Sequence, residues 1–259
     1  MSARETSRPN RRERFWLLLL VLLAAGVRLY LASQPRVIRW DEPDYLWLGK
    51  SLLTGYGYTI GGAPELHYTP LFPLLAGGVY ALTGNPELGS SFWYVLLGAA
   101  TVVPVYALAR RIYGVRVGLT VAGLAAIFPA LSSAVLYWGT MTEPLFIFLI
   151  WCALWAAHRA LEDERPWRFG LVGGLLCLAY LSRPEGIVWA AAIGALFVVV
   201  WWVRRRKWSW RLAACFAVYV AVFLLLALPY AALLHRYTGK WMATGKLSIT
   251  YDIGEAVLE

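Results

Sequence analysis

Long apolar stretches separated by short polar ones dominate the chain. The first apolar stretch covers residues 14–33, and a longer, mixed connection then extends to about residue 90. Six further apolar segments follow, over residues 90–114, 117–138, 145–161, 169–181, 187–203 and 212–234. A helix needs about 20 mostly apolar residues to cross the hydrocarbon core of a bilayer. The pattern therefore predicts an all-α, polytopic helical membrane protein with about seven transmembrane helices.

The connection over residues 34–90 has an internal pattern of its own. Its segment 67–84, HYTPLFPLLAGGVYALTG, contains an apolar run of only about 14 residues, which is too short for a full span. The glycine-rich stretch 55–64, GYGYTIGGAP, precedes it and is typical of turns. We therefore expect interfacial or re-entrant helices in this connection.

Composition agrees with this interpretation and orients the chain. Of the 259 residues, 60% are hydrophobic and 15% are charged, against roughly a quarter charged in soluble domains. The net charge of +9 comes mainly from the basic tail 1–13 and from residues 110–116, 159–168 and 204–211. Because basic loops stay cytoplasmic, we expect a cytoplasmic N-terminus, an uncleaved signal anchor and an outer connection 34–90 in the cell membrane. Basicity then reflects topology and contact with anionic membrane lipids, and nucleic acid is not an expected partner.

With this topology, the remaining polar features gather on the outer face. They are Asp41, Glu42 and Asp44, then His67, then Glu143, and finally Arg183 and Glu185. Ionisable groups at membrane depth are costly and usually line a water-filled cavity or a site. These residues are therefore candidates for one site.

For each candidate, a structural or solvent-exposed role is an alternative to a functional one, and the residues alone do not decide between them. Asp41 could act as a general base, bind a divalent cation or be solvated. Tyr45 and Trp47 could stack on sugar rings or belong to an interfacial aromatic belt. Glu143 needs a partner near hydrocarbon, or it simply complements a helix N-terminus.

Two basic candidates and one arginine in the first span are open in the same way. Arg183 could pair with phosphate oxygens or contact lipid headgroups. His67 is more often structural than a metal ligand, and no metal-ligand spacing surrounds it. Arg28 is expected to extend to the membrane interface. The three cysteines lie in apolar segments and show neither metal nor disulfide spacing.

Four ordered motifs carry a family resemblance. They are W-D-E-x-x-Y at residues 40–45, H-x-x-P-L-x-P at 67–73, T-E-P at 142–144 and S-R-P-E-G at 182–186. In this order, and on one side, they resemble the N-terminal part of the GT-C superfamily of polyprenyl-phosphate-sugar-dependent membrane glycosyltransferases. The chain looks like the relatives of protein O-mannosyltransferases and lipid A aminoarabinose transferases. The resemblance covers about residues 10–250.

The resemblance implies a function and residue roles. It implies inverting transfer of a sugar from a polyprenyl-phosphate donor to a glycan, lipid or protein acceptor on the outer face. Asp41 matches the family acid that is the presumed base or holds the acceptor, with Glu42 as its acidic neighbour, and Glu143 matches the acid of the second outer turn. Arg183 would approach the lipid-linked phosphate, helped by a basic residue such as Arg236 or Lys240. His67 occupies a position that is polar in relatives and sometimes binds metal.

Some questions stay open at this level. No cofactor is assigned, although a divalent metal held by His67 and Glu143 is an alternative. The chain is expected to form a single transmembrane domain over residues 1–259 that is incomplete at its C-terminus, because relatives continue for several more spans. A catalytically silent scaffold or assembly subunit and a lipid or solute transporter are the alternative functions.

Overall fold

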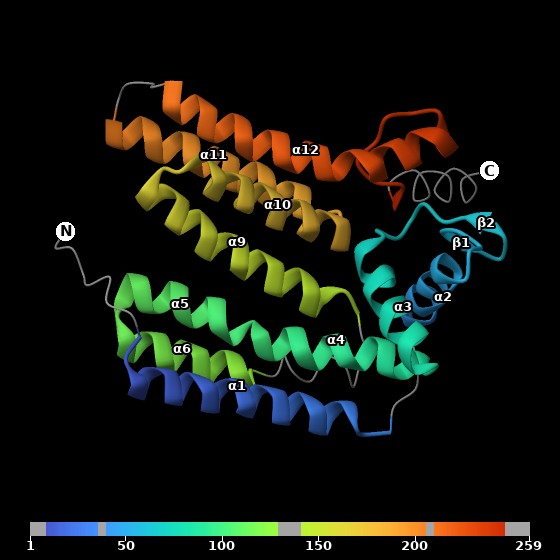
Figure 1. Cartoon of the computed structure of the whole chain (residues 1–259), viewed down its shortest axis with the longest axis horizontal. Helices are drawn as coiled ribbons and strands as arrows, with labels where there is room; N and C mark the ends of the chain where they lie inside the picture. Colours follow the sequence, from blue (N-terminus) through green and yellow to red (C-terminus); the bar gives the residue numbers. More distant parts are fainter. Residues whose placement is uncertain (1–8, 36–39, 129–140, 206–209, 247–259) are drawn as a thin grey trace, which may run out of the picture.

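The computed structural model describes residues 9–35, 40–128, 141–205 and 210–246, and its long helices run lengthwise beside one another (Figure 1). The lengthwise helices are α1 (Arg11–Ala32), α4 (Pro86–Ala100), α5 (Val102–Tyr113), α6 (Val115–Ile127), α9 (Glu143–Asp163), α10 (Pro166–Ser182), α11 (Gly186–Arg205) and α12 (Trp210–Thr238). A smaller group lies at one end and comprises α2 (Glu42–Leu53), α3 (Leu71–Thr83), β1 (Thr59–Ile60) and β2 (Ala63–Pro64). The two strands pair antiparallel, with Thr59 opposite Pro64 and Ile60 opposite Ala63.

Five of the helices are long and apolar enough to cross a membrane. They are α1, the α4–α5 run over residues 87–113, α9, α11 and α12. Of the other predicted spans, α10 has 17 residues and packs within the same bundle. The segment 117–138 is described only to residue 128, where α6 has ended. The predicted polytopic helical membrane fold is confirmed, and α2 and α3 are the shorter helices expected in the first long connection.

Local sequence signals set the helix ends near the site. Asn85 caps α4, because its Oδ1 accepts hydrogen bonds from the backbone N–H groups of Glu87 (2.9 Å) and Leu88 (3.2 Å). Gly84 ends α3 with φ of 67°, a left-handed conformation that glycine adopts without strain. Proline in the first turn of α2, α9 and α10 suits helix starts that leave the first N–H groups unbonded.

The centre of the bundle is α10, which packs against α9, α11 and α12. Its side chains Phe169, Val172 and Leu176 are fully buried. In lipid, helices associate through close packing more than through the hydrophobic effect, so small residues bring backbones together. Gly173 follows this rule, because a Cβ atom there would collide with the backbone carbonyl of Tyr219 on α12.

Arg28 corrects one prediction from the sequence. Its side chain does not extend to the membrane interface and is 1% exposed. The Nη1 atom donates to the carbonyl oxygens of Ala24 (3.1 Å) and Ala126 (3.0 Å). Because α6 packs against α1 at this level, the guanidinium finds backbone acceptors inside the bundle and ties the two helices together.

The two ends of the bundle differ in the charged residues they carry. The start of α1 lies at the same end as the α5–α6 and α9–α10 junctions, the end of α11 and the start of α12, whereas α2, α3 and the strand pair lie at the other (Figure 1). The first end carries the basic residues Arg110, Arg111 and Arg165. The second end carries the acidic and aromatic stretch that begins α2. The side of the membrane on which each end lies stays a prediction.

Candidate active site

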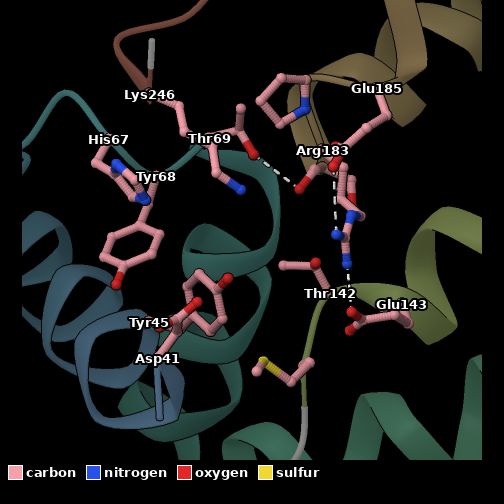
Figure 2. Close-up of a pocket in the computed structure, with 13 residues that line it drawn as sticks. Asp41, Tyr45, His67, Tyr68, Thr69, Thr142, Glu143, Arg183, Glu185 and Lys246 are labelled. Atoms are coloured by element: carbon pink, nitrogen blue, oxygen red, sulfur yellow. Dashed lines mark hydrogen bonds and ion pairs between the residues drawn. The ribbon is translucent and has the colours of Figure 1, made fainter. Parts of the chain in front are cut away.

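A cavity of about 120 Å³ opens at the end of the bundle where α2 and α3 lie. Five separate stretches of the chain line it (Figure 2). They are the start of α2, residues 67–69, residues 141–143 before and at the start of α9, residues 182–185 after α10, and Lys246. Acidic, basic, aromatic and hydroxyl side chains that lie far apart in sequence therefore share one cavity.

Asp41 reaches this cavity because of the way α2 begins. It is the N-cap residue of α2, yet its side chain makes no capping hydrogen bond to the helix. The preceding residue, Trp40, has φ of 55°, a conformation uncommon for a residue with a side chain. The chain thus turns sharply into α2 and leaves the Asp41 carboxylate available to the cavity.

Arg183 is held between two carboxylates. Its Nη1 donates to Glu143 Oε1, and its Nη2 lies 3.4 Å from Glu185 Oε1. Burial acts against the charge of Arg183, but Glu143 and Glu185 outweigh it and raise the pKa of the guanidinium. Burial also opposes the charge of Glu185, but its own backbone N–H, Arg183 and Lys246 lower its pKa below the usual value. The bridge joins the start of α9 to the turn after α10.

Two tyrosines form the wall on the α2 side. The rings of Tyr45 and Tyr68 meet edge to face with centroids 5.0 Å apart, and Tyr68 Oη donates to Asp44 Oδ2 at 3.0 Å. Burial, followed by the negative charge of Asp41, raises the pKa of both hydroxyl groups. Both phenols stay protonated at neutral pH and can donate hydrogen bonds.

Hydrogen bonds and close packing between segments fix the positions of these walls. Thr69 Oγ1 donates to the carbonyl oxygen of Ser182 at 2.7 Å, which joins residues 67–69 to the end of α10. Tyr180 Oη donates to the carbonyl of Ala243 at 2.5 Å. Gly245 packs so closely on Leu66 that a side chain would collide with that residue's carbonyl oxygen. The stretch after α12 is therefore anchored where Lys246 lines the cavity.

The cavity brings together most of the residues predicted from the sequence. Asp41, Tyr45, His67, Glu143 and Arg183 all line it. Glu143 is also the first residue of α9. It therefore both lies at a helix N-terminus and has a charged partner in Arg183. Their chemical roles stay predictions.

Other predicted residues lie elsewhere. Glu42 is 1% exposed and is not among the residues that line the cavity. Trp47 lines a different cavity, formed with Lys50 and residues around β1. Arg236 and Lys240 do not line the site, and the basic residue of the last stretch that does is Lys246.

Sequence reasoning also missed Tyr68, Thr69 and Lys246. The first two directly follow His67 in the H-x-x-P-L-x-P motif, so the motif itself could have indicated them. Nothing in the sequence around Lys246 distinguishes it from Arg236 or Lys240. In the described ranges, no group of three or more histidine, cysteine, aspartate or glutamate side chains could hold a metal ion. The metal alternative for His67 and Glu143 therefore gains no support from neighbouring ligands.

Comparisons with known proteins agree with this architecture. Residues 67–233 match the family described as dolichyl-phosphate-mannose-protein mannosyltransferase. Twelve solved chains match the fold, and one is the crystal structure of ArnT from Cupriavidus metallidurans bound to undecaprenyl phosphate. That structure has a TM-score of 0.68 and 19% identity, with 88% of this chain covered. This chain spans 42% of that protein's length. No curated protein sequence matches the chain.

Proposed function

Because this chain belongs to the dolichyl-phosphate-mannose-protein mannosyltransferase family, we propose that it forms the reaction site of a GT-C membrane glycosyltransferase. The enzyme transfers a sugar from a polyprenyl-phosphate donor to an acceptor at the outer face of the cell membrane. The observation that carries the proposal is the convergence of Asp41, Glu143 and Arg183 in one cavity (Figure 2). A base and a phosphate ligand are the two groups that such a transfer needs.

Arg183 is proposed to bind the donor phosphate. Its planar guanidinium matches phosphate oxygens in a bidentate geometry and stays charged. Glu143 and Glu185 pair with this guanidinium and hold it at the cavity wall. Donor phosphate competes with these carboxylates and leaves the guanidinium in place, so Arg183 is positioned before the donor arrives. Lys246 adds a second positive charge at the same cavity.

Asp41 is proposed to act as the base. The acceptor oxygen attacks the anomeric carbon, and the bond between that carbon and the phosphate oxygen breaks. The electron pair leaves with the polyprenyl phosphate, whose charge Arg183 neutralises, and the acceptor proton passes to the Asp41 carboxylate. A single displacement of this kind inverts the anomeric centre. Tyr45 and Tyr68, both protonated, supply hydrogen-bond donors beside this path.

A groove in the bundle suits the lipid part of the donor. Residues of α11 and α12 enclose an apolar space of about 380 Å³ that begins at Ile187, two residues after Glu185. Ala190, Gly194 and Val198 line it along α11, which places its far end about 16 Å deeper at 1.5 Å per residue. A donor whose phosphate binds at Arg183 could therefore place its polyprenyl chain in this groove.

The position of the charged groups favours an enzyme over a transporter. Transporters place ionisable residues near the bilayer midplane, often on broken helices. Here the site residues lie at one end of the bundle, beside α2 and α3 (Figure 1). The scaffold alternative predicts that the cavity residues can be replaced without loss of any reaction.

The test is transfer of labelled sugar from a polyprenyl-phosphate donor, measured in membranes that contain the full chain. The Asp41→Asn variant should abolish transfer while membrane insertion stays normal. The Glu87→Gln variant, at an exposed position in the first turn of α4, makes the same chemical change outside the cavity and should leave transfer unchanged. Near-normal transfer by Asp41→Asn would sink the assignment of the base.

A further inference from the structure

A second cavity, of about 590 Å³, lies on the side of α2 that faces away from the proposed active site. Trp47, Lys50, Ser51 and Thr54 line it, and their spacing of three and four residues places them on one face of the helix. Tyr45 lies about 200° around the helix from Trp47, at 3.6 residues per turn. The thickness of α2 therefore separates this cavity from the proposed active site. We propose that it binds a saccharide carrying an anionic group, such as a phosphate or a carboxylate.

The aromatic walls suit the sugar ring. Trp47 and Tyr56 keep 51% and 77% of their surface exposed, although both are large apolar groups. A sugar presents C–H groups on its ring faces, and these pack against flat aromatic faces while the hydroxyl groups point outward. Tyrosine and tryptophan combine an apolar face with a polar edge, so they tolerate such a half-wet ligand.

The hydroxyl groups of the cavity are oriented to accept hydrogen bonds from a sugar. Thr54 Oγ1 donates its proton to the carbonyl of Lys50 at 2.8 Å, so its two lone pairs act as acceptors. Ser51 Oγ and Thr59 Oγ1 lie 3.1 Å apart. Because Thr59 Oγ1 donates its proton to the carbonyl oxygen of Tyr56 at 3.2 Å, Ser51 Oγ donates to Thr59 Oγ1 and keeps its own lone pairs as acceptors. Sugar hydroxyls donate readily to oxygens of this kind.

Lys50 provides the charge that selects an anion. Its Nζ lies 5.7 Å from the ring centroid of Trp47 and 5.6 Å from that of Tyr80. These rings attract the ammonium without neutralising it. Within the described ranges, no carboxylate oxygen lies within 4.0 Å of this ammonium, the limit used for an ion pair. The Lys50 charge is therefore available to a ligand at the wall of the cavity.

Trp47 and Tyr56 could instead belong to an aromatic belt at the membrane surface, but such a belt does not require a cavity beside it. Belt residues lie on an open face, whereas this cavity is also lined by Thr59 of β1 and by Gly62 of the turn between the two strands. Its volume lies in the range of about 300–1,000 Å³ that small-molecule sites occupy. A saccharide with one negative charge matches the size, the aromatic faces and the single cation together.

The test measures binding of glucose 6-phosphate to the full chain in nanodiscs of neutral lipid. Binding is detected by saturation-transfer-difference NMR. Glucose and inorganic phosphate are measured in parallel. We expect saturable binding of glucose 6-phosphate, weaker binding of either half-ligand, and at least a tenfold loss of affinity in Trp47→Ala and in Lys50→Ala. Trp47→Phe and Lys50→Arg should retain most of the affinity. Trp202→Ala and Lys240→Ala, which change exposed residues outside the cavity, should bind as the unchanged protein does.

Two results would overturn the proposal. One is binding of glucose 6-phosphate that neither Trp47→Ala nor Lys50→Ala weakens. The other is that these variants lose only their association with phosphatidylglycerol vesicles, which would make the face a membrane anchor. Addition of a phosphorylated glycolipid to the nanodiscs distinguishes a lipid-linked saccharide from a soluble one, since only the former competes from within the bilayer. The measurement needs neither donor nor turnover, so its outcome is independent of the proposed transfer reaction.

Discussion

The crossing of α2 and α3 sets the position of the proposed base, and it depends on two glycines. Gly49 on α2 and Gly77 on α3 are buried where the two backbones meet. A Cβ atom on Gly49 would collide with the backbone carbonyl oxygen of Pro73 and would also lie 2.6 Å from Gly77 Cα, about 0.8 Å short of the 3.4 Å at which ordinary contact begins. The obstacle is backbone on both sides, so no side chain can rotate away to relieve the collision.

Because the collision with the Pro73 carbonyl oxygen is the tighter of the two, Gly49→Ala is expected to move α2 relative to α3 by about 1 Å. Asp41 begins the same helix, about 12 Å from Gly49 at 1.5 Å per residue. A displacement of about 1 Å at a catalytic group can cost about 100-fold in rate. Overpacking of this kind also costs about 1–3 kcal/mol of stability. We expect transfer to fall about 100-fold, with a lower unfolding temperature and normal membrane insertion.

The matched control is Gly78→Ala, one residue along α3. A Cβ atom there has no heavy atom within 4 Å. Both substitutions gain about 1 kcal/mol of helix propensity, so a difference between the variants reports the contact and not the propensity. The assay is sugar transfer in membranes, combined with thermal unfolding in detergent. Transfer by Gly49→Ala at the rate of Gly78→Ala would refute the reasoning that the crossing positions Asp41.

Three other predictions concern the phosphate ligand, pH and sidedness. Arg183→Lys should weaken donor binding at least tenfold, because an ammonium cannot replace the bidentate guanidinium; donor titration measures this, and an unchanged affinity would remove Arg183 from the phosphate site. The pKa of Glu185 lies below its ordinary value of 4.5, so its contribution to stability is present above that pH and is lost as pH falls through the lowered value. Thermal unfolding should therefore show an acid-side loss that is smaller in Glu185→Gln, and equal acid sensitivity would contradict the pairing. Ala63→Cys should react with a membrane-impermeant thiol reagent on intact cells, whereas Arg165→Cys should react only after permeabilisation; the reverse labelling would overturn the predicted orientation.

The helices could be predicted from the sequence because long apolar runs have few alternatives in a bilayer. The break between α4 and α5 was less visible, since it depends on Thr101 and on Pro104, which has no N–H to donate to the helix. The burial of Arg28 could not be predicted, because it depends on the carbonyl oxygen of Ala126 on α6, which lies 98 residues away in sequence. Hydrophobic periodicity along the sequence describes one helix at a time. It does not indicate which neighbouring helix buries a charged side chain such as Arg28.

The candidate site was predictable to the extent that its residues lie in turns on one side of the membrane. Topology alone assigns Asp41, Glu143 and Arg183 to one level of the membrane, so their grouping could be predicted from the sequence. It could not separate Trp47 from Tyr45, which lie on opposite faces of α2. The sequence indicated a basic residue after α12, such as Arg236 or Lys240. It could not identify Lys246, because the path of the chain there depends on the contact of Gly245 with Leu66.

Donor binding and sugar transfer, measured on the same membranes, test the central claim most directly. The account predicts that Asp41→Asn binds the polyprenyl-phosphate donor with nearly unchanged affinity but transfers no sugar. It predicts that Arg183→Ala loses donor affinity as well as transfer. Transfer by Asp41→Asn at a near-normal rate, or loss of donor binding in that variant alone, would contradict the assignment of base and phosphate ligand.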